Sequence, residues 1–418
     1  MSLIKAILKF FSHVIQALGN AEGLRHLIDT SLPSSVGSIF DRQMLFSHSV
    51  VGAALLLFSS LIHQEPTSLS IFQEIGLVDK YFNLACGPLP VSFEVIYGVA
   101  NAYSAVCLNE NGLQSFKDRK ALSSLFKIFI DPDFTRTLID GDLSGTLGHL
   151  LDEFSRHQPS IQDELVDQLI QFVEHISDIP NIDSPITQIE ILGPFLEGLF
   201  QNASVVRLFT EKGGIERLLT LLKNPLNESL ISNSSLNSIT RASRMICEVD
   251  PAKMLDTCLK ATQKSITASQ SVAIVAEFLQ FQSLQGNRKI QLVNLIDTTK
   301  KVDIQPFREL SRYLGMLSDV VRTPIFGQGQ SVRFFLKSML DFPNFLKDLE
   351  LVYTYFIFHI FKMSLDHPIP FIINLNLNTH ATRLKPYLPY DEMIFLLLYW
   401  HSPTWEIFKL AYQTSFIA

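Results

Sequence analysis

Apolar side chains recur along most of the chain with the spacing of an α-helix. Segments 92–108 and 161–176 both place them at positions i, i+3, i+4 and i+7, which gathers them on one side of a helix. Long alternating runs rich in Val, Ile and Thr, which would indicate β-strands, are lacking. Prolines between the periodic segments can end one helix or begin the next. The pattern predicts an all-α chain.

Three segments share one arrangement: a phenylalanine closes a helix, a short polar turn follows, and an apolar helix comes next. The phenylalanines are Phe72, Phe116 and Phe209, separated by 44 and 93 residues. The second separation is close to twice a repeat of about 46 residues, and armadillo and HEAT repeats are about 40–47 residues long. Gly76 and Gly213 can supply the left-handed conformation of the turn. We therefore predict an armadillo/HEAT-like α-solenoid of stacked helical repeats; a non-repetitive helical fold is the alternative.

The helical repeats are regular in one part of the chain and less regular in the other. Residues 1–225 carry the clear repeats, whereas residues 226–418 form a less regular helical continuation. A Gly-containing stretch at 325–331 indicates a flexible break, and four prolines punctuate residues 368–389. We predict two regions, 1–225 and 226–418, and leave open how residues 368–418 dock.

Composition and charge narrow the classes of partner. Of the 418 residues, 47% are hydrophobic and 18% are charged, with a net charge of −7. A mildly acidic chain is poorly suited to nucleic acid. The apolar block 49–62 is shorter than the ~20 residues that cross a bilayer, and block 351–365 is interrupted by charge. Both are predicted to be core helices, so we expect protein partners and no membrane.

The side chains offer little reactive chemistry. Cys86, Cys107, Cys247 and Cys258 form no CxxC pair and have no clustered histidines, so neither a zinc site nor a disulfide framework is expected. This use of cysteine fits a reducing compartment, cytoplasmic or nuclear. Gly-containing residues 327–330 lack the lysine of a phosphate loop. We expect no catalytic residue, no metal and no cofactor.

One cluster of charged residues is expected to form ion pairs on a helix and to carry no catalytic role. Asp152 and Glu153 precede Arg156 and His157 by one helical turn, so they can form ion pairs at i, i+3 and i, i+4. We predict that this cluster is a solvent-exposed face of a helix.

Four segments, taken together and in order, resemble one protein family. They are EGLRHLIDTSLPSS (22–35), NAYSAVCLNENGLQSFKDRKALSSLFKIFIDPDF (101–134), LGHLLDEFSRHQPS (147–160) and FTEKGGIERLLTLL (209–222). Residues 18–225 resemble the N-terminal armadillo-like arm of the giant HECT-type ubiquitin ligases of the Mule/Tom kind. The resemblance departs at 177–184, where the family carries a long acidic insert.

The resemblance implies a scaffold role in ubiquitin transfer. Full-length relatives are HECT-type ubiquitin transferases, which need a catalytic cysteine near the C-terminus, and no cysteine follows Cys258. We therefore expect a non-catalytic arm, either part of a giant ligase or a shortened relative. A stand-alone armadillo-type adaptor in transport or tethering is the alternative.

The polar residues beside one turn are the candidate protein-binding site. Asn109, Asn111 and Gln114 lie near the turn before Phe116, where short loops of a solenoid can vary without harm to the core. Helix capping at the same turn is the competing explanation for these residues.

Overall fold

The computed structural model describes residues 2–17, 21–178, 184–221 and 234–284, together with positions 309, 310, 313, 316 and 320. Within these residues the backbone forms α-helices and short 3-10 helices, and no β-strand. The predicted all-α fold is confirmed for this part of the chain.

The helices follow one another in triplets along the sequence. Their bounds are α1 (Ser2–Ala17), α2 (Ala21–Ile28), α3 (Leu32–Asp41), η1 (Gln43–Leu45), α4 (His48–Gln64), α5 (Ser68–Glu74), α6 (Leu77–Ala85), α7 (Phe93–Val106), α8 (Glu110–Asp118), α9 (Ala121–Ile130), α10 (Pro132–Ile139), η2 (Asp140–Asp142), α11 (Leu143–His157), η3 (Pro159–Ile161), α12 (Gln162–Asp178), α13 (Ser184–Leu199), α14 (Ala203–Glu211), α15 (Gly214–Thr220), α16 (Ser234–Val249) and α17 (Pro251–Leu284). Triplets α4–α5–α6, α7–α8–α9 and α13–α14–α15 each consist of a long helix, a short helix and a third helix. The predicted recurrence is confirmed.

The chain divides into two compact units. The first contains residues 1–217 and 226–245, and the second contains residues 218–225 and 246–418. The predicted regions 1–225 and 226–418 remain a prediction. The predicted break at 325–331 and the segment 368–418 lie outside the described residues. The repeats discussed below belong to the first unit.

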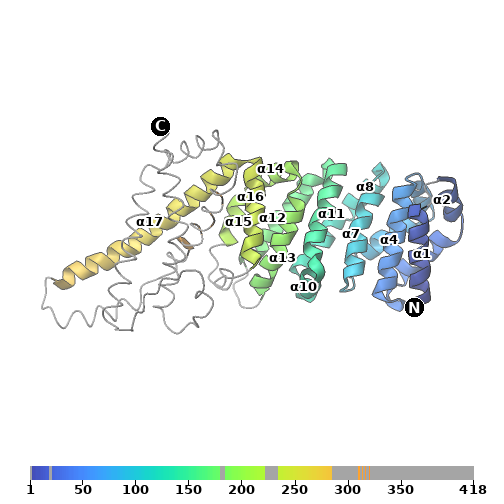
Figure 1. The fold of residues 1–418 in the computed structure, drawn as a ribbon, viewed down its shortest axis with the longest axis horizontal. Coiled ribbons are helices and arrows are strands. Elements are labelled where there is room, and N and C mark those ends of the chain that lie inside the picture. Colours follow the sequence, from blue (N-terminus) through green and yellow to red (C-terminus); the bar gives the residue numbers. More distant parts are fainter. Residues whose placement is uncertain are drawn as a thin grey trace. The chain divides into compact units, whose positions relative to one another are not determined.

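The first unit contains two rows of helices. In one row the long helices α1, α4, α7, α11 and α13 pack side by side in sequence order (Figure 1). In the other row α3 packs on α6, α6 on α9, and α9 on α12. Each repeat therefore contacts chiefly its neighbours, which is the organisation of an armadillo-like solenoid.

The long helices α1, α4 and α7 begin close together in space, as the environment of Glu94 shows. The pKa of the Glu94 carboxyl is lowered by hydrogen bonds to its own backbone and to Ser92, and further by Lys5 and His48. These last two residues belong to the first turns of α1 and α4, and Glu94 belongs to the first turn of α7. The starts of three successive long helices are therefore aligned at one edge of the array.

Each predicted repeat phenylalanine is fully buried near the end of a short helix. Phe72 lies in α5, Phe116 in α8 and Phe209 in α14, all with no exposed surface. The phenylalanines join an aromatic core that runs between repeats; the ring of Phe116, for example, contacts the rings of Tyr103 and Phe154. Burial of several such rings per repeat is the main source of stability in this array.

The turns after the short helices adopt the predicted left-handed conformation. Gly76 has φ 72° and Gly213 has φ 77°. The equivalent position in the middle repeat is Lys120, with φ 51°, although it is not a glycine. The three residues are 44 and 93 positions apart, the same spacing as the phenylalanines.

Close helix contacts depend on glycines in the long row. Gly148 of α11 and Gly198 of α13 face each other, and a Cβ added at Gly148 would lie 2.3 Å from the backbone oxygen of Phe195. The backbones of α11 and α13 therefore approach more closely than any larger side chain would allow.

The apolar block 49–62 lies within α4, where most of its side chains are buried against other helices. Among the described helices, none has the length and apolarity needed to cross a bilayer. The prediction of a core helix is confirmed for this block, whereas block 351–365 lies outside the described residues.

Candidate protein-interaction site

The structure gives Asn109 a capping role. Asn109 is the N-cap of α8, and its Oδ1 accepts a hydrogen bond of 2.7 Å from the backbone N–H of Gly112. The same oxygen lies 3.5 Å from Nε2 of Gln73 in the preceding repeat. An Asn at this position satisfies one of the free N–H groups of the first helical turn. Capping explains the type of residue at this position without any bound partner.

Asn111 and Gln114 are both exposed on α8. Nε2 of Gln114 donates a 2.7 Å hydrogen bond to Oδ1 of Asp118, one turn further along the helix. The structure thus brings all three predicted residues to one helix, but only two of them remain available on its surface. Their role in protein binding remains a prediction.

Ion pairs cross from one repeat to the next on the side of the third helices. Nη2 of Arg119, at the end of α8, lies 2.6 Å from Oδ1 of Asp79 in α6. Nζ of Lys212, at the end of α14, lies 2.7 Å from Asp163 and 2.6 Å from Asp167, both in α12. Exposed pairs of this kind each contribute roughly 0–1 kcal/mol. Their main consequence is a surface on which acidic and basic side chains of successive repeats lie beside each other.

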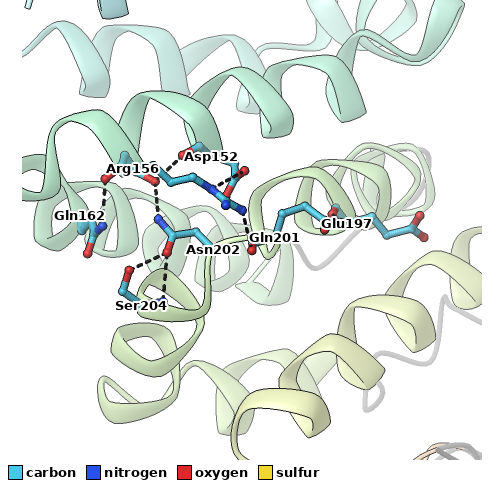
Figure 2. A network of polar contacts seen from close by, with 8 residues as sticks. Asp152, Arg156, Gln162, Glu197, Gln201, Asn202 and Ser204 are labelled. Carbon is cyan, nitrogen blue, oxygen red and sulfur yellow. Dashed lines mark hydrogen bonds and ion pairs between the residues drawn. The ribbon is translucent and has the colours of Figure 1, made fainter. Parts of the chain in front are cut away.

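A second cluster joins α11 to the loop between α13 and α14, and we call it the polar junction. It consists of Asp152, Ser155, Arg156, Gln201 and Asn202. Nε of Arg156 lies 3.1 Å from Oδ2 of Asp152, and its Nη2 donates a 2.6 Å hydrogen bond to the backbone oxygen of Gln201. Figure 2 shows the Arg156 side chain between these two partners.

Asn202 completes the polar junction from the other side. Its Nδ2 donates to Oγ of Ser155 at 3.1 Å, while its Oδ1 accepts from the backbone N–H of Ser204 and so caps α14 (Figure 2). Asn202 is buried, with 7% of its surface exposed. Although a glycosylation sequon begins at this residue, its amide is already used within the fold.

The prediction of a solvent-exposed face at residues 152–157 is wrong for Asp152. Only 7% of Asp152 is exposed, and its Oδ1 is a buried oxygen without a hydrogen-bond partner. Burial raises the pKa of the Asp152 carboxyl, and the hydrogen bond from Arg156 only partly opposes this effect. The sequence pattern was misleading because acidic and basic residues at i, i+4 look alike on exposed and on packed helices.

None of the four thiols has the environment of a nucleophile. Cys107, Cys247 and Cys258 are buried, and Cys86 is half-buried. Burial raises the pKa of Cys86, Cys107 and Cys258 above that of an ordinary thiol. A thiolate, the form that attacks an acyl group, is therefore disfavoured at these three cysteines.

Comparison with known proteins identifies relatives of this chain. Residues 1–185 match the model of DUF913, described as a domain of unknown function. The chain is 33% identical over 186 residues to the E3 ubiquitin-protein ligase HUWE1 of Mus musculus. The predicted resemblance to giant ubiquitin ligases is confirmed.

Two further relatives carry similar names. The chain is 29% identical over 248 residues to the E3 ubiquitin-protein ligase ptr1 of Schizosaccharomyces pombe, and 30% identical over 271 residues to UPL1 of Arabidopsis thaliana. These matches cover 56% and 54% of this chain, and the HUWE1 match covers 43%. They span only 4–8% of the relatives' own lengths. The matched part of the chain is thus a ubiquitin-ligase-related region.

Proposed function

We propose that this chain is a non-catalytic scaffold arm of a HECT-type ubiquitin-protein ligase, on which substrates or regulatory domains dock. The similarity to three named ubiquitin ligases over 186–271 residues carries the proposal. The fold supports it, because stacked repeats expose a long surface whose loops can vary without disturbing the core. The role belongs in the cytoplasm or the nucleus, where ubiquitin ligases find their protein substrates.

The surface of α8 and α9 is our candidate for part of the docking site. Asn111 and Gln114 are exposed on α8, and Lys127 is exposed on α9. Polar and charged groups of this kind suit a partner held by hydrogen bonds and ion pairs, as at the rim of a protein interface. Asn109 supports this surface indirectly, because it fixes the start of α8.

The environments of the thiols support a role other than ubiquitin transfer. HECT-type transfer requires a thiolate that accepts ubiquitin as a thioester. Burial raises the pKa of three of the four cysteines, and the fourth, Cys247, is buried. We expect the 418-residue chain to form no ubiquitin adduct when it is incubated with activating enzyme, conjugating enzyme, ubiquitin and ATP.

That expectation is checked by non-reducing electrophoresis, with an isolated HECT domain as the positive control. A ubiquitin adduct that disappears on reduction would contradict the non-catalytic role. Cys86→Ser would then show whether the least buried thiol is the acceptor.

Docking is tested by affinity capture with the full chain and with the variant Asn111→Arg/Gln114→Arg. The captured proteins are compared with the cellular proteins whose ubiquitination falls when the ligase that contains this chain is depleted. We expect the two sets to overlap, and the overlap to shrink for the variant. Arg244→Glu, which changes the charge of an exposed residue on α16, serves as a folded control. Capture of transport or tethering factors, without any overlap, would favour the alternative adaptor function.

A further inference from the structure

The connection between α11 and α12 exposes one serine. Ser160 lies in η3 (Pro159–Ile161), and its side chain is exposed to solvent. Its Oγ accepts a hydrogen bond of 3.3 Å from Nζ of Lys117, which lies 43 positions earlier in the chain. Lys117 is half-buried on α8, so the hydrogen bond joins the helices of two successive repeats. An accessible hydroxyl and a cation of the preceding repeat thus lie side by side.

Acidic residues follow this serine closely in the sequence. Asp163 and Glu164 come three and four residues after Ser160, in the first turn of α12. Protein kinases choose their substrates partly by the charges beside the target hydroxyl, and one class requires an acidic residue three positions after it. The segment from Ser160 to Asp163 has this pattern.

The place of Ser160 in the fold distinguishes it from other hydroxyls with the same pattern. In the part of the chain that the structure describes, four more serines or threonines precede an acidic residue by three positions. All four lie within α-helices: Ser38 in α3, Ser115 in α8, Thr137 in α10 and Thr187 in α13. A kinase binds a short extended segment, which the interior of a helix supplies only by unfolding. Ser160 precedes α12, and helix ends open more easily than helix interiors.

We propose that Ser160 is a phosphorylation site for a serine/threonine kinase of the class that requires an acidic residue after its target. The γ-phosphoryl group of ATP passes to Oγ of Ser160, and the bond from its phosphorus to the bridging oxygen of ADP breaks. The hydroxyl proton passes to the catalytic base of the kinase. The phosphoserine carries about −1.5 to −2 charges at neutral pH and three acceptor oxygens.

Two lysines lie where they can hold this phosphate. Burial raises the pKa of the Glu164 carboxyl, and the charges of Lys117 and Lys120 partly oppose that effect. Both lysines are therefore near the first turn of α12, and Lys117 already contacts Oγ of Ser160. The phosphate would form a charge-assisted pair with Lys117.

The modification would strengthen a contact between two successive repeats, because Lys117 belongs to α8 and the phosphate would lie at the start of α12. The nearby charge of Asp163 is balanced by Lys212, whose Nζ lies 2.7 Å from its Oδ1. The positive end of the α12 dipole also favours a negative group at this position. The site does not depend on the proposed ligase role.

Phosphorylation of the folded 418-residue chain tests the site. The chain is incubated with ATP, Mg²⁺ and a purified kinase that requires an acidic residue three positions after its target, and phosphates are located by mass spectrometry. We expect a phosphate on Ser160 that is lost in Ser160→Ala and kept in Ser38→Ala, the matched control with the same pattern inside a helix. A chain that gains no phosphate on Ser160, or gains it only after unfolding, would overturn the proposal.

The pKa of the phosphate tests its pairing with Lys117. Phosphorus NMR of the phosphorylated chain follows the second ionisation, which is near pH 6 in an ordinary phosphoserine. Lys117→Met should raise this pKa by roughly half a unit, because the dianion loses a nearby cation. Lys117→Arg, which keeps the charge, should preserve the lower value, as should Lys9→Met, an exposed position on α1. The same pKa in Lys117→Met and in the unmodified chain would overturn the pairing.

Discussion

Lys120 holds a left-handed backbone conformation that glycine holds in the equivalent turns of two other repeats. Its φ of 51° compares with 72° at Gly76 and 77° at Gly213. A side chain is disfavoured in this conformation by roughly 1 kcal/mol, because Cβ crowds the backbone. We therefore expect Lys120→Gly to raise the stability to urea by roughly 0.5–1 kcal/mol.

Lys120→Ala is the matched control, because it removes the same charge but keeps a Cβ in the left-handed conformation. It should give no comparable gain. A Lys120→Gly variant that is less stable than the unmodified chain would show that the Lys120 side chain contributes more than its backbone conformation costs.

The buried carboxyl of Asp152 gives the fold a specific pH dependence. Burial raises the pKa of Asp152, so the folded chain binds this proton more tightly than the unfolded chain does. The contribution of Asp152 to stability is therefore greatest below its ordinary pKa and is lost as the pH rises through the folded pKa. Relative to Asp152→Asn, the melting temperature of the unmodified chain should fall between about pH 4 and pH 7.

Melting of both proteins over this pH range checks the expectation, with Asp133→Asn, an exposed carboxylate on α10, as the control. If the melting temperature of the unmodified chain instead rises relative to that of Asp152→Asn as the pH increases, the ion pair with Arg156 outweighs the burial.

At the scale of single elements, the start of α8 depends on the absence of a side chain at Gly112. A Cβ added there would lie 1.9 Å from the backbone oxygen of Val106. This contact requires α8 to move away from the end of α7. We expect Gly112→Ala to lower the stability by roughly 2–4 kcal/mol, whereas Asn111→Ala, exposed beside it, should change little. Similar melting temperatures for the two variants would contradict the tight packing of this turn.

The sequence predicted the elements that repeat and missed those that occur once. Phe72 and Gly76 were predictable because their residue types recur at the repeat spacing. The left-handed turn at Lys120 was not, because a lysine carries no local signal for that conformation. The short helix α10, inserted between α9 and α11, begins at Pro132, a proline that would also fit a simple turn.

The candidate sites were less predictable than the fold, because burial depends on neighbouring repeats. Asp152 looks like part of an exposed charged helix, but α11 packs against α13 and buries it. A local pattern shows that one side of a helix is apolar, but not how many neighbours the helix has.

At the scale of the whole first unit, the repeats are held together by stacking on their nearest neighbours. Helices α4, α7 and α11 each pack against the long helix before and the long helix after, so a disturbance should spread chiefly to adjacent repeats. A single shared core would instead transmit the disturbance throughout the unit. The two possibilities differ in how amide protection is lost when one interface is damaged.

Hydrogen exchange of the full chain carrying Gly148→Val tests this claim most directly. The valine would separate α11 from α13, where an added Cβ already meets the backbone. With nearest-neighbour stacking, protection should fall in residues 143–211 and be retained in α4 to α7. Equal loss of protection across residues 21–221 would contradict it.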